Sequence, residues 1–285
     1  MRLAIFADIH GNMPALEAVL ADMAGEGVDQ IIVAGDLVCG PQPEETRRLL
    51  QSLECQMIRG NGDTYLLRFD DKEAPDYWWT SKAFSTIRWH YKQSSPETLA
   101  FLRSLPEQRR IANGSRPAIR LVHGSPRHPT EDLHPQWDPI LLENTLAGMA
   151  ESVLICGHTH QPWSANINGR LALNPGAVSA PLNGEVGAQY ALLTWSQQDL
   201  HVEHRLVAYD LGRLRAIYRD GGLLEAGGAF TRGWLCSIES GRDMVNPFLD
   251  HARMMADEAG YGESEYVPDA IWDQAAATFE WPDIA

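Results

Sequence analysis

Five short motifs rich in Asp, His and Gly punctuate the first 160 residues of the chain, and each follows a short apolar run. Short apolar runs bounded by glycine are typical of buried strands. The carboxyl ends of parallel strands meet at one edge of an open α/β sheet, where ligands bind. The pattern therefore predicts an α/β fold with one site built from Asp8-Ile9-His10, Gly35-Asp36, Gly60-Asn61-Gly62-Asp63, His123-Gly124 and Gly157-His158-Thr159-His160.

Strand and helix patterns alternate over the first sixty residues. Apolar runs at residues 3–7, 30–34 and 56–59 predict strands. Residues 13–24 and 43–53 lie between them, and the first of these segments has apolar residues at helical spacing. This order predicts a sheet with parallel strands and crossover helices.

Residues 64–107 interrupt the alternation with many aromatic residues, and we expect a helical insertion there. Within it, Ser94 is predicted to cap a helix that begins at Pro96. The neighbouring residues Trp78 and Trp79 cannot both face one core, so one of them is expected to be exposed or to line a cleft.

The rest of the chain predicts further strands and two helical regions. Asp210 is expected to cap a helix that Gly221-Gly222 ends. We expect a core over residues 1–210 and a C-terminal helical extension packed on it over residues 211–285. The predicted elements before the extension are strands at 118–122, 153–156, 165–167 and 171–174, a helix at 139–150, and a hairpin of 189–195 with 200–207 across 196–199.

Charge and composition narrow the classes of partner. The formal net charge is −15, which disfavours duplex nucleic acid and anionic membranes as partners. No stretch approaches the ~20 apolar residues of a membrane span, and the first apolar run is too short for a signal peptide. The four cysteines have no paired spacing, so we expect a cytoplasmic protein without disulfides.

The motifs supply donors for two divalent metal ions. A carboxylate must bridge two ions that lie ~3.5–4 Å apart. Imidazole favours Zn, Fe or Ni, whereas carboxylate and amide oxygens favour Mn or Mg. The sequence leaves the identity of the metals open among Mn, Fe, Zn and Ni. The candidate ligands are four imidazoles, two carboxylates and one amide, from Asp8, His10, Asp36, Asn61, His123, His158 and His160.

The five motifs, in this order, resemble those of the calcineurin-like metallophosphoesterase family. Asn174-Pro175-Gly176 is also similar to a turn in its small bacterial branch, which contains phosphodiesterases and diadenosine-tetraphosphatase-like enzymes. The resemblance implies the family's fold, a four-layer α/β/β/α sandwich of two mixed sheets with outer helices.

The resemblance also assigns roles to single residues. It implies a first metal held by Asp8, His10, Asp36 and His160, and a second held by Asp36, Asn61, His123 and His158, with Asp36 bridging. A hydroxide between the ions would attack phosphorus in line. Asn61 would help to place the phosphate, and Asp63 would orient the ligands.

The chain departs from the family at Gly62, where the protein phosphatases of the family have a histidine that aids the departing oxygen. Leaving groups of low pKa should therefore be favoured. His128 is a candidate replacement donor and Arg127 a candidate phosphate clamp, although a plain surface loop is the favoured explanation of both. The remaining histidines, His90 among them, are expected to be solvated or structural. Trp78, with Tyr77, is a candidate for stacking on a nucleobase, against a simple role in the core.

These observations predict a metal-dependent phosphoesterase that cleaves phosphodiester or phosphoanhydride bonds, dinucleoside polyphosphates included. Its partner would be a small phosphorylated substrate, with nucleotides among the candidates. Two alternatives stay open: a protein serine/threonine phosphatase and a non-catalytic interaction scaffold on the same fold. The acidic, tryptophan-containing tail leaves a homo-oligomer open, because it could cover a dimer interface.

Overall fold

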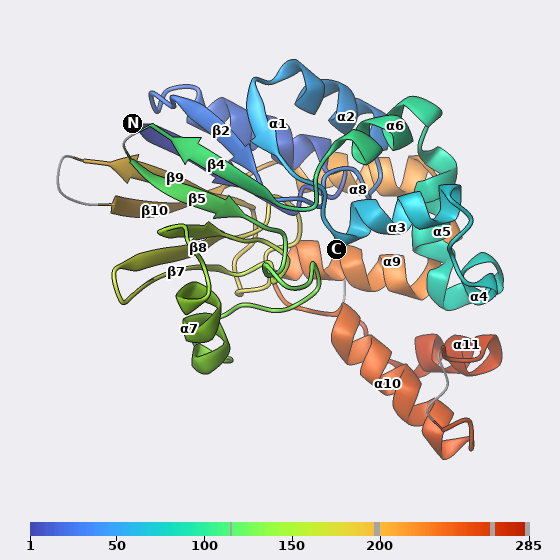
Figure 1. Ribbon diagram of the computed structural model, residues 1–285. Coiled ribbons are helices and arrows are strands. Elements are labelled where there is room, and N and C mark those ends of the chain that lie inside the picture. Colours follow the sequence, from blue (N-terminus) through green and yellow to red (C-terminus); the bar gives the residue numbers. More distant parts are fainter. Residues whose placement is uncertain (115, 197–199, 263–265, 283–285) are drawn as a thin grey trace.

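The computed structural model describes residues 1–114, 116–196, 200–262 and 266–282, which contain two five-stranded sheets (Figure 1). The first sheet has the order β10-β9-β1-β2-β3, and the second has the order β4-β5-β6-β8-β7. The first sheet comprises β1 (Arg2–Phe6), β2 (Gln30–Val33), β3 (Cys55–Met57), β9 (Ala188–Trp195) and β10 (Leu200–Val207). The second comprises β4 (Arg109–Asn113), β5 (Arg116–Leu121), β6 (Val153–Ile155), β7 (Pro162–Ile167) and β8 (Arg170–Pro175).

Both sheets are mixed, as predicted. Strands β1, β2 and β3 pair in parallel, and β9 extends that sheet by pairing antiparallel with both β1 and β10. Strands β5, β6 and β8 are also parallel, with β4 and β7 antiparallel at the two edges. The parallel strands send their carboxyl ends toward the same region, which is where the polar motifs lie.

The two sheets face each other across a layer of apolar side chains. In β1, Leu3 and Ile5 enter this layer, whereas Ala4 and Phe6 pack on the opposite face of the sheet. This alternation follows from the two-residue period of a strand. The facing sheet contributes side chains such as Leu121, Val153, Ile155 and Leu173 to the same layer.

Helices form the outer layers. Helix α1 (Met13–Met23) and α2 (Pro43–Ser52) cover the outer face of the first sheet. Asn12 caps α1 by accepting a hydrogen bond from the Ala15 backbone nitrogen at 3.1 Å. On the second sheet, α7 (Pro139–Ala147) packs Leu142 and Leu146 against Leu154 and Trp163. The predicted four-layer α/β/β/α sandwich is confirmed.

The predicted helical insertion is also confirmed. It contains α3 (Asn61–Asp70), α4 (Asp76–Thr80), a short 3-10 helix (Lys82–Phe84), α5 (Ser85–Gln93) and α6 (Pro96–Ser104). The predicted cap at Ser94 is wrong: Ser95 caps α6 by accepting from the Thr98 nitrogen, while the Ser94 hydroxyl donates to the His90 carbonyl. Trp78 is buried and Trp79 is 40% exposed, so the two neighbours face different surroundings, as expected.

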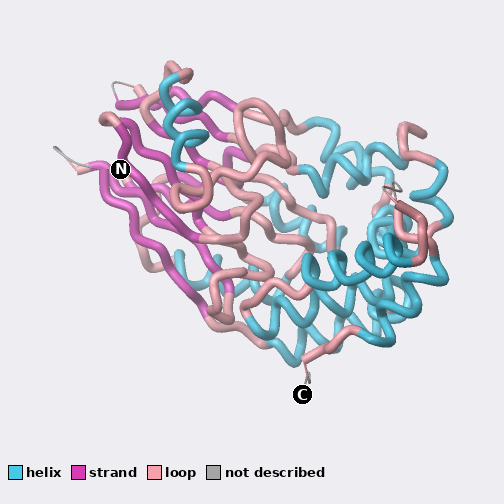
Figure 2. The backbone as a smooth tube through the Cα atoms, turned by 90° about the horizontal axis from the view of Figure 1, so that it is seen from below, coloured by secondary structure: helices cyan, strands magenta, loops and turns pink. Residues whose placement is uncertain are grey.

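Four helices follow residue 210: α8 (Leu211–Asp220), α9 (Leu223–Ser240), α10 (Val245–Glu258) and α11 (Asp269–Thr278). The Asp210 carboxylate caps α8 by accepting from the Arg213 nitrogen at 2.8 Å, as predicted. Helix α9 bends at Gly228 and packs on α5, where the hydroxyls of Thr86 and Thr231 lie 2.8 Å apart. Helices α10 and α11 project from the main body (Figure 1), and most helices gather on one side of the strands (Figure 2).

Two details differ from the pattern-based expectations. Strand β4 was not expected, because Arg109 and Arg110 interrupt any apolar run, yet the segment pairs antiparallel with β5. Helix α7 ends at Ala147, three residues before the predicted position. Residues 197–199 of the predicted hairpin turn lie outside the described residues, although β9 and β10 pair as expected. Within the described residues, we find no helix with the length and apolarity of a membrane span.

Candidate metal centre

The polar motifs lie directly after the carboxyl ends of the parallel strands. Asp8 and His10 follow β1, Asp36 follows β2, and His123 follows β5. Several of these residues have a left-handed backbone, with positive φ values at Asp8, His10, Asp36, His158 and His160. Such a backbone is uncommon outside glycine and is found where the surrounding structure over-determines it, often at functional sites.

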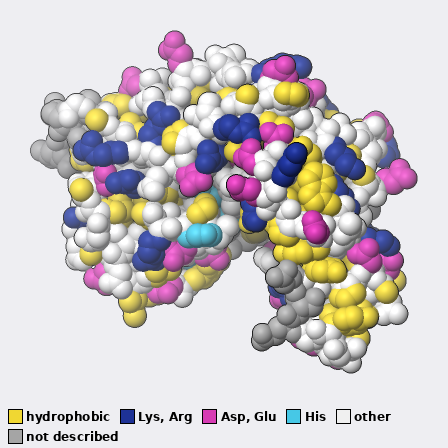
Figure 3. All heavy atoms as spheres, turned by 45° about the vertical axis from the view of Figure 1, so that its right-hand side comes forward, with side chains coloured by type: hydrophobic (Ala, Val, Ile, Leu, Met, Phe, Trp, Pro, Cys, Tyr) yellow, Lys and Arg dark blue, Asp and Glu magenta, His cyan; other side chains and the backbone are white. Residues whose placement is uncertain are grey.

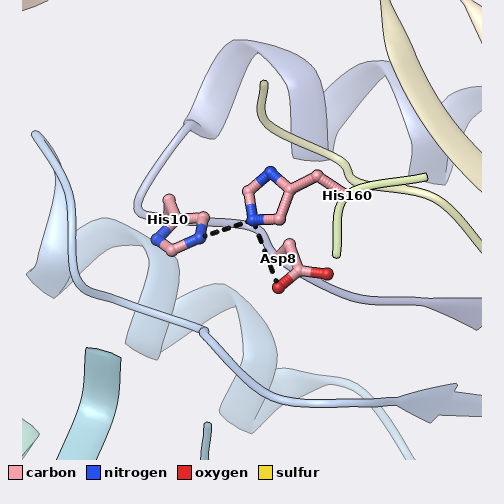
Figure 4. A group of neighbouring side chains, drawn as sticks. All are labelled: Asp8, His10 and His160. Carbon is pink, nitrogen blue, oxygen red and sulfur yellow. Dashed lines mark hydrogen bonds and ion pairs between the residues drawn. The ribbon is translucent and has the colours of Figure 1, made fainter. Parts of the chain in front are cut away.

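Asp8, His10 and His160 form the first group of converging donors (Figure 4). The Nε2 atoms of His10 and His160 lie 3.3 Å apart. The Nε2 atom of His160 lies 3.5 Å from the Asp8 carboxylate. All three side chains are buried, which is the setting in which such donors bind a metal ion rather than solvent.

Asp8, Asp36 and His123 form the second group. The Asp36 Oδ2 atom lies 3.4 Å from His123 Nε2 and 3.5 Å from His10 Nε2, so this carboxylate stands between the two groups. Asp8 also reaches both groups, with its Oδ1 atom 3.9 Å from His123 Nε2. The five residues are referred to below as the ligand cluster: Asp8, His10, Asp36, His123 and His160.

Backbone carbonyls orient the imidazole rings of the cluster. The Nδ1 atoms of His123 and His160 lie 2.7 Å from the Ala34 carbonyl and 2.8 Å from the Ala180 carbonyl, and each donates its hydrogen there. His10 Nδ1 faces the Cys39 carbonyl at 3.3 Å. These contacts leave the Nε2 lone pairs pointing into the cluster, as in the outer-shell bonds that fix metal-binding histidines.

Two buried polar atoms of the motifs make no well-formed hydrogen bond among the described residues. They are Oδ1 of Asn61 and Nε2 of His123, whose nearest contact is the Asp36 carboxylate at 3.4 Å. A buried donor or acceptor without a partner costs stability, so each such atom calls for an explanation. Both atoms belong to residues that the sequence analysis assigned to the second metal. The donor set, imidazole nitrogens with carboxylate and amide oxygens, fits divalent transition-metal ions.

Burial and mutual charge shift the titration of the cluster. Burial raises the pKa of Asp8 to about 8. For His123, burial opposes the charged form, but the neighbouring Asp36 carboxylate outweighs it and raises the pKa to about 10. The same pairing, against the effect of burial, lowers the pKa of Asp36. Burial lowers the pKa of His160 to about 3, so its ring is neutral at pH 7, and the Nδ1 hydrogen donated to the Ala180 carbonyl leaves a lone pair on Nε2.

His158 lies at the edge of the cluster. Its ring centroid is 5.3 Å from that of His123, and its Nε2 lies 3.5 Å from the Asp132 carboxylate. Its backbone nitrogen donates to the Asp8 carboxylate at 3.2 Å. The structure therefore places His158 beside the second group but outside the two tightest sets of donors, and Asp132 was not singled out from the sequence.

Asp63 and Asn174 support the loops that carry the ligands. The Asp63 carboxylate accepts hydrogen bonds from the backbone nitrogens of Leu37, Val38 and Gly60, and so ties the loop after β2 to the start of α3. The Asn174 amide donates to the Gly157 carbonyl at 2.6 Å and to the Thr159 hydroxyl at 3.1 Å. The Asn-Pro-Gly turn thus braces the Gly-His-Thr-His loop.

A cavity of about 400 Å³ opens beside the ligand cluster and is called the side cavity below. His10, Asp36, His158 and His160 lie on its wall, together with Asn61 and Gly62. The other walls come from α5 and from the C-terminal helices, including Phe230 and Trp234 of α9 and Leu249 of α10. The molecular surface is indented between the main body and the projecting lobe (Figure 3).

The structure does not bring the other substrate-binding candidates to this cavity. Trp78 packs among aromatic residues, stacked on Phe84 with ring centroids 5.3 Å apart, because the insertion needs a core of its own. Arg127 pairs with Glu131 at 2.7 Å, and the His128 ring bonds the Thr130 hydroxyl. None of the three is among the residues that line the side cavity.

Two residues beside the cluster were missed by sequence reasoning. Trp234 meets the rings of His10 and His160 edge-on, with centroids 4.9 Å and 5.5 Å away. His90 is buried on the wall of the side cavity rather than solvated, and burial lowers its pKa to about 3. Neither residue lies in a motif, and no local signal marks them, because their positions depend on how α5 and α9 pack.

The sequence and the fold of the chain are similar to those of known proteins. Residues 1–198 match the family model described as Calcineurin-like phosphoesterase superfamily domain. A solved structure, the metallophosphoesterase from Sphaerobacter thermophilus, is 29% identical, with a TM-score of 0.66 over 85% of this chain and 100% of that chain. The protein belongs to the calcineurin-like phosphoesterase superfamily.

Two relatives give the range of similarity. The chain is 31% identical over 231 residues to the Uncharacterized protein MJ0912 of Methanocaldococcus jannaschii, covering 73% of this chain and 88% of the relative. It is 26% identical over 204 residues to the Phosphodiesterase YfcE of Escherichia coli, covering 68% of this chain and 87% of the relative. The expected family resemblance is confirmed.

Proposed function

We propose that the protein is a dinuclear metal-dependent phosphoesterase that hydrolyses phosphodiester or phosphoanhydride bonds. One observation carries this proposal: two groups of buried donors have the Asp8 carboxylate in common, the Asp36 carboxylate of the second group also approaches His10 of the first, and the imidazole Nε2 atoms all face inward. A packing role does not need inward lone pairs beside buried carboxylates, because such groups cost free energy unless something binds them.

The residues would divide the work between the two ions. His10 and His160, with Asp8, would hold one ion, and His123, Asn61 and His158 the other, with Asp36 shared between them. Bound divalent ions supply activation of water for attack on phosphorus and offset the charge on the phosphate oxygens.

The protein's own groups would position the substrate. The Asn61 amide lies on the wall of the side cavity and would contact a phosphate oxygen as well as a metal. Asp63 would not contact the substrate. Its carboxylate would hold the loop that carries Asp36 in place by accepting hydrogen bonds from three backbone nitrogens. The helices from residue 211 onward would form an extension that shapes the substrate cavity. The free cysteines are consistent with a cytoplasmic location, which we also propose.

A metal-reconstituted activity panel tests the proposal. Purified protein receives Mn, Fe, Zn, Ni or Mg in turn and is assayed on bis-p-nitrophenyl phosphate, p-nitrophenyl phosphate, diadenosine tetraphosphate and a phosphoserine peptide. We expect metal-dependent cleavage of the diester or the dinucleotide, and less cleavage of the peptide, because the serine oxygen is a poorer leaving group than a nitrophenolate or a nucleotide phosphate.

The outcomes separate the rival functions. Preference for the peptide would indicate a protein phosphatase on the same dinuclear centre. Full activity in the Asp36→Asn or His158→Ala variant would contradict the dinuclear mechanism. Failure to bind metal tightly, together with no activity on any substrate, would favour the non-catalytic scaffold.

A further inference from the structure

The side cavity differs in chemistry from the ligand cluster that it adjoins. Most of its exposed lining is apolar. The polar side chains beyond the cluster are a few hydroxyls, the Cys39 thiol, the imidazoles of His90 and His158, the amides of Asn61 and Asn246, and the Asp243 carboxylate. Much of this lining belongs to the C-terminal helices, including Leu223, Phe230, Trp234, Val245 and Leu249. A mostly apolar cavity with few polar groups is the usual form of a site for an uncharged organic group.

The side cavity offers no cationic side chain among the described residues that line it. Beyond the ligand cluster, its charged lining residue is Asp243, at the start of α10. Both oxygens of Asp243 are already engaged: Oδ1 accepts from the nitrogens of Val245 and Asn246, and Oδ2 accepts from the Asn246 amide at 2.7 Å. A second phosphate or a carboxylate placed here would be an anion without a counter-charge, which is strongly unfavourable in a site of low polarity.

The side cavity lies where a departing group would go. In-line displacement at phosphorus places the leaving oxygen opposite the attacking oxygen, on the side of the phosphate away from the ligand cluster. Trp234 lies edge-on to the rings of His10 and His160, so the apolar wall begins directly at the cluster. A phosphate held by the cluster would therefore direct its leaving group between α5, α9 and α10.

We propose that the side cavity is a leaving-group pocket, and that the substrate is a phosphodiester whose leaving alcohol or phenol is bulky, largely apolar and uncharged. This inference rests on the proposed phosphoesterase function. It narrows the substrate class, because phosphoanhydrides such as dinucleoside polyphosphates release a charged nucleotide. The C-terminal helices thereby select the substrate, while the ligand cluster performs the reaction.

Two diesters that differ only in leaving-group charge test the proposal. They are methyl 4-nitrophenyl phosphate and the same compound with a carboxylate beside the nitro group of the leaving phenol. We expect the metal-loaded enzyme to cleave the uncharged compound with a kcat/KM at least ~10-fold higher, because the carboxylate finds no partner in the cavity. Titration calorimetry gives a second readout. Phenylphosphonate should bind at least ~10-fold more tightly than methylphosphonate, because its ring is buried against the apolar walls of the cavity.

A pair of lysine variants on α10 sharpens the test. Asn246→Lys puts a cation at the cavity, whereas Met254→Lys puts the same cation on an exposed part of the same helix outside the lining. We expect Asn246→Lys to reduce the preference for the uncharged leaving group at least ~5-fold and Met254→Lys to leave it unchanged.

The results distinguish failure of the inference from failure of the proposed function. No cleavage of either diester with any metal would overturn the phosphoesterase itself. Equal cleavage of both diesters, with no effect of Asn246→Lys and equal binding of the two phosphonates, would overturn the leaving-group pocket alone. A preference for the carboxylated compound would also overturn it.

A second, independent observation concerns the proton donor that Gly62 does not supply. His90, on α5, is 7% exposed, and its Nε2 atom has no partner among the described residues. Its Nδ1 atom lies 3.2 Å from the Cys39 thiol. Cys39 in turn lies beside the position that a side chain at residue 62 would take, because a Cβ atom on Gly62 would lie 3.3 Å from the Cys39 Cβ.

We infer that His90 donates a hydrogen bond from Nε2 to the leaving oxygen in the side cavity. The Cys39 sulfur lies 3.2 Å from Nδ1, and a thiol that donates its hydrogen there leaves the ring hydrogen of the neutral imidazole on Nε2, which has no hydrogen-bond partner among the described residues. His90 thus takes, from a different helix, the role that the protein phosphatases of the family give to a histidine at the position of Gly62. A donor to the leaving oxygen matters most for poor leaving groups.

A leaving-group series tests the role of His90. Methyl aryl phosphates with 4-nitrophenol, 4-chlorophenol and phenol as leaving groups are compared in His90→Gln, whose amide reaches the Nε2 position, and His90→Asn, whose shorter amide does not. We expect His90→Asn to lose activity progressively, up to ~100-fold for phenol, and His90→Gln to recover most of it. His134→Asn, at another buried histidine outside the cavity lining, is the matched control. It should not change the slope of log kcat/KM against the pKa of the leaving phenol.

The dependence of kcat/KM on the leaving group distinguishes a direct contact of His90 with the substrate from a purely structural role of His90. An equal loss for all three leaving groups in His90→Asn would mean that His90 only supports the fold. Full activity of His90→Asn on the phenol ester would likewise overturn the inference.

Discussion

The Asp36 carboxylate lies 3.4 Å from Nε2 of His123, and both side chains are buried. His123 is held from behind by its Nδ1 contact with the Ala34 carbonyl, so Nε2 has no alternative direction. The Asp36 carboxylate raises the pKa of His123 to about 10, which favours a proton on Nε2 in the metal-free protein, and a bound metal ion would replace that proton. Metal binding by the protein should therefore depend on the pH of the solution and on substitutions at this pair and at the residues that hold it in place.

Replacing Asp36 with asparagine should remove the shared carboxylate while keeping its shape. We expect metal content to fall and kcat/KM for bis-p-nitrophenyl phosphate to drop at least ~100-fold, because one neutral oxygen cannot bridge two cations. Metal analysis and steady-state kinetics measure the two effects. Asp71→Asn, at an exposed carboxylate paired with Arg103, is the control and should change neither. Retention of both metals by Asp36→Asn would contradict the shared-ligand assignment.

Metal should stabilise the protein more at pH 9 than at pH 6. The folded-state pKa values of Asp8, about 8, and His123, about 10, lie above the usual 3.8 and 6.5. A raised pKa contributes stability that is complete below the unfolded value and is lost as pH rises through the folded value. The free energy of unfolding of the metal-free protein therefore falls between pH 6 and pH 9. Metal binding requires both groups to be deprotonated, so the affinity for metal rises about tenfold per pH unit for each proton released.

Thermal melts with and without metal at the two pH values check this dependence. The metal-induced rise in melting temperature should be larger at pH 9. An equal rise at both would show that Asp8 and His123 are already deprotonated at pH 6.

Gly60→Ala should damage the centre although it adds a single methyl group. A Cβ atom at residue 60 would overlap the carboxylate and the backbone nitrogen of Asp36. Because backbone cannot move as a flexible side chain does, we expect a loss of about 1–3 kcal/mol in the free energy of unfolding and at least ~100-fold in kcat/KM. In Gly25→Ala the new methyl group meets nothing within 4 Å, so this control should keep full activity. Urea denaturation and kinetics report the two quantities, and a fully active Gly60→Ala would refute the close approach.

Asn174→Ala should loosen the loop that carries His158 and His160. The buried Asn174 amide donates to the Gly157 carbonyl and the Thr159 hydroxyl, and its oxygen accepts from the Gly176 nitrogen. Leaving these groups without partners should cost about 2–3 kcal/mol in the free energy of unfolding and weaken metal binding. The exposed Asn183→Ala variant should stay within about 0.5 kcal/mol of the parent. Denaturant titration in the presence of chelator separates the effect on the fold from the effect on the metal, and a loss seen only with metal present would rule out the brace.

The sequence alone was sufficient for the strands that carry the ligands. Asp8, Asp36 and His123 follow short apolar runs. Such a run is a property of the local sequence, so the ends of these strands could be predicted. The order of the motifs then indicated that distant segments meet at one sheet edge, because parallel strands direct their carboxyl ends the same way. Strand β4 escaped prediction because Arg109 and Arg110 carry no apolar pattern, and its strand form depends on pairing with β5.

The tertiary structure decided which side chains surround the ligand cluster. Trp234 and His90 lie in helices without motifs, and they reach the site because α9 packs on α5, where the hydroxyls of Thr86 and Thr231 meet. Trp78 was a reasonable stacking candidate by composition, but the insertion buries it in a core of its own. The candidate ligands follow strand ends that the local sequence pattern predicts. The cavity walls arise from packing between segments more than 140 residues apart, and that packing has no signature in either segment alone.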